Sequence, residues 1–254
     1  MRCILFCLLA LCFVASASHI RRFTQEDSRP NQFLVFDDDD TSVLIDTGLG
    51  TPEGNVDLVN FINSQGVDNL NAIFITHAHP DHYGGVPFLA ESFPDARIEV
   101  ATQQVHDELV ANAPLFFPYE EFDWENNIIV QDDDEFYDEL DLLVLSDFPG
   151  AESQSYGMIY NADDNYIVTG DALFIDFHPY LGSGVNLQSL RSWYGDTLLQ
   201  LSDGGAIGLN KNTVYYPGHG PQGDYLQVAV LIKYLQDFED LVLSCPNTEF
   251  PILL

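Results

Sequence analysis

Three histidines and an aspartate stand within six consecutive residues of this chain, directly after the largely apolar run NAIFIT. They are His77, His79, Asp81 and His82. So many ionisable groups in one loop would repel and desolvate one another unless a cation held them. Pro80 is well suited to open a helix, so the two histidines before it can bind one ion while the two residues on the first helical turn face a second. The stretch therefore predicts a metal site at the end of a buried strand.

Strand-like and helix-like segments alternate along most of the chain. Residues 31–50 favour two strands and residues 71–76 a third. The segment between them is predicted as a helix whose apolar side carries Val56, Val59, Phe61 and Ile62. Residues 136–174 favour paired strands, and residues 225–243 favour a long helix. This order indicates an α/β fold with polar residues at the strand ends, so the site is expected along one edge of a layered structure.

The first 18 residues have the layout of a secretory signal peptide. Arg2 precedes an apolar run that ends at Val14, and three small residues follow. The run is shorter than the roughly 20 residues that span a bilayer, and no later stretch is as apolar. We therefore expect residues 1–18 to be removed, residues 19–254 to form one domain, and the protein to be secreted to the extracellular side.

The chain carries 40 acidic and 8 basic residues, which gives a formal net charge of −32 at pH 7. Such a field repels phosphate backbones and anionic lipid surfaces, so we expect neither nucleic acid nor a membrane as a partner. Two acidic runs, residues 37–40 and 132–135, lie between strand-like segments. Calcium binding is one interpretation of these runs, and solvated turns are the interpretation we favour.

Four motifs occur along the chain in a fixed order: LIDTG at residues 44–48, THAHPDHYGG at 76–85, VTGDALF at 168–174 and YPGHGP at 216–221. Together they resemble the signature of the metallo-β-lactamase-fold hydrolases. A single pair of spaced histidines would be a weak signal, whereas four motifs in order are a strong one. The resemblance covers nearly the whole chain after the leader.

The resemblance implies a four-layer αββα sandwich with two metal sites in the cleft between its central sheets. The first site would use His77 and His79, the second would use Asp81, His82 and His219, and Asp171 would bridge them. Asp46 would orient one of these ligands, with an ordinary turn residue as the alternative. The expected cofactor is zinc, as one or two ions, and iron or manganese tolerates the same ligands.

One motif departs from the family pattern. Members usually carry a Pro-Gly-His loop that supplies the third histidine of the first site, and here the sequence FPGAESQ places Ala151 at that position. An alanine cannot bind a metal. The first site is then completed by Asp171 and water alone, by Glu152, by His178, or not at all.

The resemblance implies a secreted metal-dependent hydrolase that cleaves an ester, thioester, lactone or lactam bond of a small-molecule substrate. A metal-bound hydroxide would attack the carbonyl carbon, and Asp81 would also relay a proton. Tyr180 and Trp193 are candidates for the mouth of the cleft, with packing as the alternative. A second hypothesis is a metal-holding secreted protein without catalysis, whose acidic surface serves ion binding or adhesion.

Overall fold

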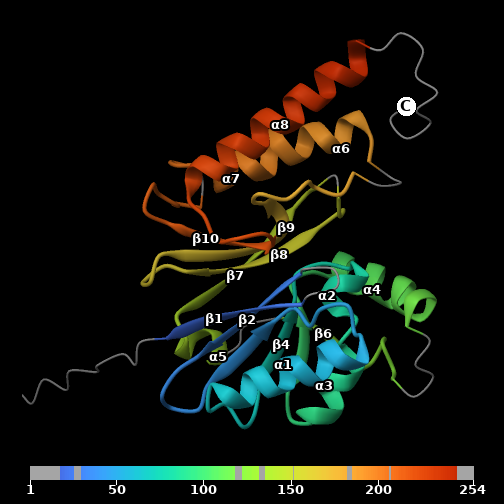
Figure 1. Ribbon diagram of the computed structural model, residues 1–254, viewed down its shortest axis with the longest axis vertical. Coiled ribbons are helices and arrows are strands. Elements are labelled where there is room, and N and C mark those ends of the chain that lie inside the picture. The colour runs from blue at the N-terminus through green and yellow to red at the C-terminus, as the bar shows by residue number, and fades with distance from the viewer. Residues whose placement is uncertain are drawn as a thin grey trace, which may run out of the picture.

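The structure of the protein is a computed structural model, which describes residues 18–25, 30–117, 122–131, 135–150, 152–181, 185–205 and 207–244. Its strands form two sheets that pack face to face (Figure 1). The first sheet has six strands in the order β1-β2-β3-β4-β5-β6, and the second has four in the order β10-β9-β8-β7. Residues 1–17, on which the leader prediction rests, and residues 132–134 of the second acidic run lie outside the described residues.

The first sheet is mixed and the second is mainly antiparallel. Strands β1, β2 and β3 are antiparallel neighbours, and β3 to β6 run parallel. In the second sheet β7, β8 and β9 are antiparallel, and β10 runs parallel to β9. The strands are β1 (His19–Thr24), β2 (Asn31–Phe36), β3 (Ser42–Ile45), β4 (Ala72–Ile75), β5 (Arg97–Val100), β6 (Ile128–Val130), β7 (Leu142–Phe148), β8 (Tyr156–Asn161), β9 (Tyr166–Phe174) and β10 (Val214–His219).

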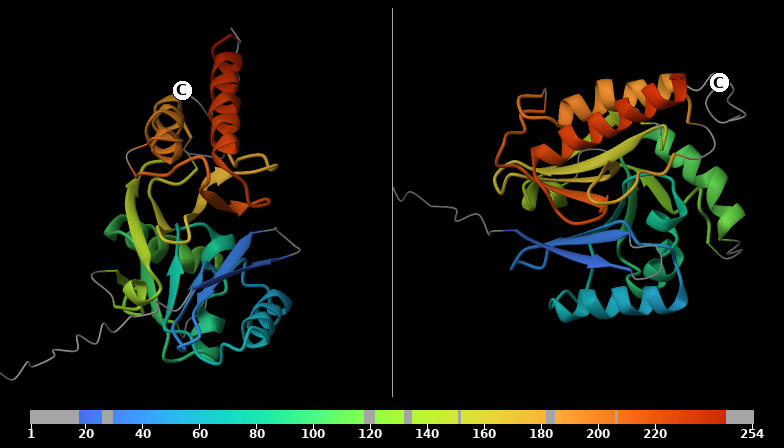
Figure 2. Two further views of the ribbon diagram at one scale, coloured as in Figure 1. Left: turned by 90° about the vertical axis from the view of Figure 1, so that its left-hand side faces the viewer. Right: turned by 45° about the horizontal axis from the view of Figure 1, so that its top comes forward.

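Helices cover the outer face of each sheet, so the fold is the predicted four-layer αββα sandwich (Figure 2). Helices α1 and α3 lie against the first sheet, and α6 to α8 lie against the second. No helix in the described part of the chain combines the length and apolar character needed to cross a bilayer. The helices are α1 (Pro52–Ser64), α2 (Pro80–Tyr83), α3 (Val86–Ser92), α4 (Gln103–Phe116), α5 (Glu135–Glu139), α6 (Leu187–Ser192), the π-helix η1 (Trp193–Thr197), α7 (Leu198–Leu201) and α8 (Tyr225–Ser244).

Side chains along the central strands alternate between two cores. In β3, Val43 and Ile45 pack between the sheets, whereas Leu44 packs against the helices of the first layer. In β4, Phe74 faces the space between the sheets and Ile73 faces the helices. A strand buried on both faces is therefore apolar at every position, because successive side chains point to opposite sides.

Two local predictions from the sequence are wrong. Val56 of α1, expected on the apolar side, is 48% exposed. Ile62 is buried as expected, Val59 and Phe61 pack against the core, and Leu58 is a further buried residue. The stretch predicted as a strand from residue 136 begins as helix α5 and becomes strand β7 only at Leu142. A helix places Tyr137 and Leu140, three residues apart, on one side, and both are buried in the core between the sheets.

The two sheets approach each other closely at the edge where the predicted motifs meet. The Gly157 N–H in β8 donates a 2.8 Å hydrogen bond to the carbonyl of Thr76, which directly follows β4. A Cβ atom at residue 157 would lie 2.6 Å from the Cβ of Ala101 and 2.8 Å from the ring of Phe74. Only glycine allows this approach, which brings the end of β4 against the second sheet.

Candidate metal centre

The first sheet contributes the residues of the HAHPDH stretch. His77 and His79 lie in the segment between β4 and α2, and Pro80 begins α2, as the sequence predicts. His82 lies within α2 and is fully buried. Its carbonyl accepts a 2.7 Å hydrogen bond from the Thr47 N–H, which holds the short helix against the loop after β3.

The second sheet contributes the remaining predicted donors. Glu152 follows β7, Asp171 lies within β9, and His219 ends β10, and all three are buried. A Cβ atom at Gly218 would lie 2.0 Å from Oδ1 of Asp171 and 2.9 Å from the ring of His82. The glycine therefore allows the donors from the two sheets to meet at the seam between them.

The donor atoms form three adjoining groups, in each of which all atoms lie within 4.8 Å of one another: His77, His79 and Glu152; His77, His82 and Asp171; Asp81, His82 and His219. Asp171 Oδ1 lies 3.3 Å from His82 Nε2, and its Oδ2 lies 3.5 Å from His219 Nε2. Asp81 Oδ2 lies 3.2 Å from His219 Nε2. Two donors on one tetrahedral zinc ion, each about 2.0 Å from it, lie about 3.3 Å apart. The spacing therefore suits donors that share ions, with Asp171 between two groups.

Several polar atoms of the cluster are buried without a hydrogen-bond partner among the described residues. They include Nε2 of His77, Nε2 of His82 and Oδ1 of Asp171. A buried polar atom without a partner is costly, and native structures rarely leave one unexplained. These three atoms face one another within one group, so the residues fit a bound cation.

Asp46 sets the orientation of two histidines. Its side chain accepts hydrogen bonds from Nδ1 of His82, at 2.7 Å, and from the hydroxyl of Thr76, at 2.9 Å. Because the single Thr76 proton goes to Asp46, Nδ1 of His77, 2.9 Å away, must donate to the threonine oxygen. Both rings then carry a proton on Nδ1 and turn Nε2 toward the cluster, where a bound cation would take its lone pair. The sequence pointed to Asp46 but missed Thr76, whose only signal is its position before the first histidine.

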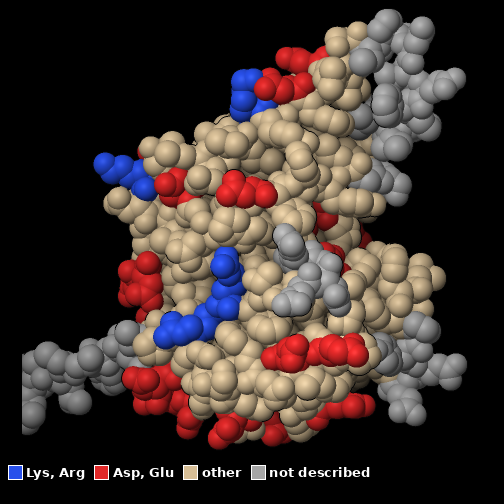
Figure 3. Space-filling model, in the orientation of Figure 1, with Lys and Arg blue, Asp and Glu red and all other residues tan. Residues whose placement is uncertain are grey.

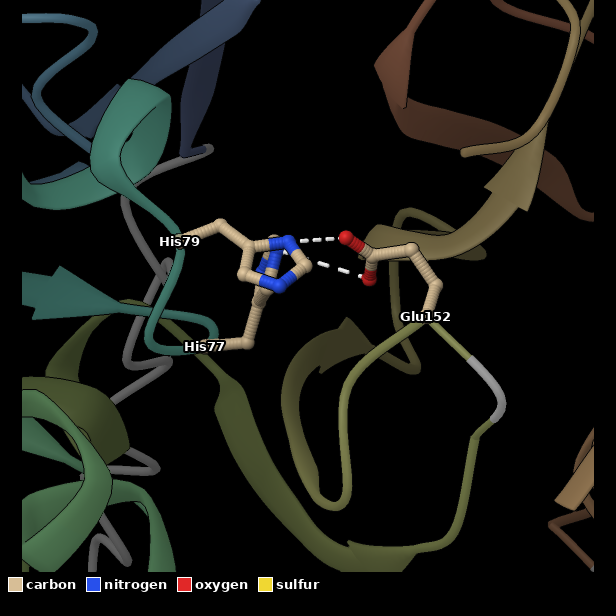
Figure 4. A group of neighbouring side chains, drawn as sticks. All are labelled: His77, His79 and Glu152. Atoms are coloured by element: carbon tan, nitrogen blue, oxygen red, sulfur yellow. Dashed lines mark ion pairs between the residues drawn. The ribbon is translucent and has the colours of Figure 1, made fainter. Parts of the chain in front are cut away.

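Glu152 lies where its carboxylate meets both histidines of the first group (Figure 4). One oxygen contacts Nδ1 of His79, and the other lies 3.7 Å from Nε2 of His77. The Tyr156 hydroxyl donates a 3.0 Å hydrogen bond to Oε2 and accepts one from the Ser153 N–H. Burial raises the pKa of Glu152 to about 6, against the opposing effect of His79. Tyr156 is a second residue that the sequence did not reveal.

His178, the other candidate replacement ligand, takes no part in the first group. Ala151 itself lies outside the described residues. His178 belongs to none of the donor groups, and its ring lies 5.9 Å from the ring of Tyr234. The sequence offered two replacement ligands. The fold brings Glu152 to the histidines, whereas His178 lines the cavity beside the donor cluster.

The charges in the cluster shift the pKa values of its own histidines. Burial lowers the pKa of His77 well below its usual value, and the neighbouring histidines act in the same direction. Burial also opposes protonation of His82, but three carboxylates outweigh it and raise that pKa well above its usual value: Asp171, Asp46 and Asp81. The carboxylates thus draw positive charge into the cluster, which is the charge that a divalent cation would supply.

A cavity of about 790 Å³ opens onto the cluster. Asp81 lines this cavity, and its side chain is 25% exposed. The side chains of Glu152 and Asp171 are only 1% and 4% exposed. Tyr180 lines the cavity and is exposed, which agrees with its expected place at the mouth of the cleft. Trp193 is fully buried and donates from Nε1 to the carbonyl of Ala172, so it is a packing residue.

An αββα sandwich with adjoining groups of histidine and carboxylate donors at the seam of its sheets is the architecture of a metal-dependent hydrolase. Residues 27–222 match the metallo-beta-lactamase superfamily, and the chain belongs to this superfamily. Its members are mostly hydrolases, and they bind divalent metals, zinc or iron. The family and the fold that the motifs predicted are thus confirmed.

Two curated relatives match short stretches of the chain. A stretch of 66 residues, 26% of the chain, is 36% identical to a hydroxyacylglutathione hydrolase from Stenotrophomonas maltophilia. A stretch of 53 residues, 21% of the chain, is 45% identical to an atrochrysone carboxyl ACP thioesterase from Aspergillus novofumigatus. The matches span 23% and 16% of the lengths of these relatives.

Solved structures share the fold over most of the chain. A metallo-beta-lactamase family protein from Thermus thermophilus superposes with a TM-score of 0.63 at 19% identity, over 91% of this chain and 84% of that one. A protein solved in a di-iron-bound form superposes with a TM-score of 0.57 at 23% identity, over 82% of this chain and 96% of that one. At these identities the likeness concerns the fold.

Proposed function

We propose that the protein hydrolyses an ester, thioester, lactone or lactam bond with the help of two divalent cations. One observation carries this proposal: buried donors from both sheets converge with unpaired lone pairs, and the cavity beside them opens to solvent. A protein that only stored a metal would need the donors but not the cavity, so the second hypothesis of a non-catalytic metal-holding protein is less well supported.

The donor groups suggest which residues would hold each ion. We assign His77, His79 and Glu152 to the first, Asp81, His82 and His219 to the second, and Asp171 to both. Imidazole and carboxylate donors suit zinc, iron and manganese, and the likeness to a protein in a di-iron form supports iron beside zinc. Bound ions of this kind supply an acidified water molecule and polarise an acyl oxygen.

Within this site Asp81 is the carboxylate that we assign to proton transfer. It lies 3.2 Å from Nε2 of His219 and has the most exposed carboxylate of the cluster, so a substrate in the cavity can reach it. Burial opposes its ionisation, but His82 and His219 hold its pKa below the usual range, so it is a carboxylate at neutral pH. A carboxylate in contact with the cavity can take a proton from water and pass it to a leaving group.

The names of the curated relatives support an acyl substrate. One relative is a hydrolase of hydroxyacylglutathione and the other is a thioesterase. Both names describe cleavage of a bond to an acyl carbon. We therefore place the substrate among small acyl compounds.

The direct test measures turnover of one ester, one thioester, one lactone and one lactam by metal-free protein and by protein reconstituted with zinc or iron. We expect at least one substrate to be cleaved only after reconstitution, and a chelator to abolish the turnover. The proposal would be contradicted if reconstituted protein bound metal but cleaved all four substrates no faster than metal-free protein.

We also propose that the protein is exported and that residues 1–18 are its signal peptide. The proposal rests on Arg2, the apolar run after it and the small residues before His19. Expression in a secreting host should release protein whose mature N-terminus is His19, as sequencing of the N-terminus would determine. Full-length protein that starts at Met1 and stays inside the cells would contradict export.

A further inference from the structure

We infer, on the basis of the proposed hydrolase function, that the acyl substrate is uncharged and apolar, and that the cavity selects against anionic compounds. The wall of the cavity outside the donor cluster carries the first argument. It is formed largely by six apolar side chains: Phe116, Phe174, Phe177, Tyr180, Leu181 and Val185. Asn112 and His178 are the only polar side chains that the described residues add to this wall.

Aromatic rings surround the open side of the cavity. Phe116 is 58% exposed, Phe177 is 41% exposed and Tyr180 is 63% exposed. The Tyr180 ring lies 6.3 Å from the ring of His79, so the mouth is close to the donor cluster. Exposed rings beside a cavity of this size provide contact area for an apolar ligand of drug-like size.

The described residues place no lysine or arginine in the cavity wall. Arg22 lines a separate cavity of about 270 Å³ that shares Phe177 with this one. The Nη1 of Arg22 donates to the Gly220 carbonyl at 3.4 Å. Three other basic residues form ion pairs with carboxylates away from the cavity: Arg97, Arg191 and Lys233. Arg29 lies outside the described residues. Within the described part of the chain, an anionic group in the cavity would thus meet no lysine or arginine in its wall.

The donor cluster does not offset this lack even when it holds metal. The cluster contains four carboxylates, whose summed formal charge balances that of two divalent ions. They are Asp46, Asp81, Glu152 and Asp171. A neutral donor in place of Glu152 would leave an excess positive charge to attract an anion. With the glutamate present, the loaded cluster offers an anionic substrate no net attraction.

The long-range field acts in the same direction. The formal net charge is −32, and on the face shown in Figure 3 acidic side chains gather over the layer of α1 and α3. Such a field lowers the local concentration of anions and their rate of approach, and salt screens it. Selection against anions should therefore have one part that depends on salt and another, set by the cavity wall, that remains.

The experiment uses matched probes on reconstituted protein. The 4-nitrophenyl esters of hexanoic acid and of adipic acid have the same chain length, and only the second ends in a carboxylate. Their ketone analogues, in which a methylene group replaces the ester oxygen, cannot be hydrolysed, and calorimetry measures their binding. We expect kcat/KM and ketone affinity to favour the neutral compound by about tenfold at low salt. The preference should shrink but persist at an ionic strength of about 1 M, where the Debye length is about 3 Å.

A pair of variants separates the cavity wall from the net charge. Tyr180→Lys adds a cation at the mouth, and Val56→Lys makes the same change in net charge on α1, in the far helical layer. We expect Tyr180→Lys to reduce the preference to about threefold or less and Val56→Lys to leave it near the wild-type value. Equal effects of the two variants would overturn the role of the wall.

The two readouts distinguish the failure of this inference from the failure of the proposed function. Tighter binding of the neutral ketone without cleavage of either ester would support the cavity's selectivity and sink the hydrolase proposal. Equal or tighter binding of the anionic ketone would overturn the selectivity, whether or not the esters are cleaved.

Discussion

Asp171→Asn should lose both metal ions and at least about a hundredfold in kcat/KM for any ester that the wild type cleaves. The two carboxylate oxygens lie 3.3 Å from His82 Nε2 and 3.5 Å from His219 Nε2, so the side chain reaches from its own donor group to a histidine of the adjoining group. An amide has nearly the same shape but no charge, and it would bring an N–H₂ group toward lone pairs. Substitution of the residues that hydrogen-bond to metal ligands lowers metal affinity or activity by about 10- to 100-fold. Loss of a ligand that two ions share should lower them further.

The measurement is metal content per chain by mass spectrometry, together with circular dichroism to establish that the variant is folded. Asp57→Asn is the matched control, because this exposed aspartate of α1 undergoes the same chemical change away from the cluster. The control should keep wild-type metal content and activity. A folded Asp171→Asn protein that retained both ions at full occupancy would show that Asp171 does not bridge the groups.

Glu152→Gln should release the ion held with His77 and His79 while the other ion stays bound. Among the described residues, the glutamate is the one carboxylate that contacts both of these histidines. Its replacement leaves two imidazoles and the shared Asp171, so the affinity of this ion should fall by at least about tenfold. Titration of zinc into chelated protein should then resolve one tight step and one weak step, where the wild type shows two tight steps.

Two further proteins make this result specific. Glu91→Gln, on the exposed surface of α3, carries the same chemical change and should titrate like the wild type. Ala151→His adds the histidine that relatives usually carry, and it should change little or crowd the site if Glu152 already coordinates. Two tight steps in Glu152→Gln, with a tighter first ion in Ala151→His, would show instead that Glu152 only pairs with His79.

The residue pattern predicted an α/β fold with a metal site at a strand end because its strongest signals are local. The motif around His77 combines an apolar strand, a dense set of donors and a helix-starting proline, and each part forms where the pattern places it. Asp171 and His219 were found through the same motif order, although they lie 94 and 142 residues from His77 in the chain. Their meeting depends on the packing of two sheets, which the resemblance supplied and the residue pattern alone could not.

The parts that sequence reasoning missed depend on contacts between distant segments. Thr76 acts through hydrogen bonds to Asp46 and His77, and Tyr156 acts through one to Glu152. No periodicity records a hydroxyl that connects two side chains. Helix α5 was mistaken for a strand because its apolar residues alone do not reveal which side faces the core.

The residues that line the cavity wall and the residues that would bind metal come from different parts of the chain, and most of the wall comes from the connection between β9 and α6. Four of the six apolar side chains of the cavity wall come from this short segment, and Phe174 ends the strand before it: the four are Phe177, Tyr180, Leu181 and Val185. None of the proposed metal donors lies in this segment, because they come from the loop before α2, from α2 itself, from the loop after β7, and from β9 and β10. Exchange of that one connection between related proteins could therefore transfer a preference for one acyl group to another scaffold, so new specificities can evolve without loss of the reaction.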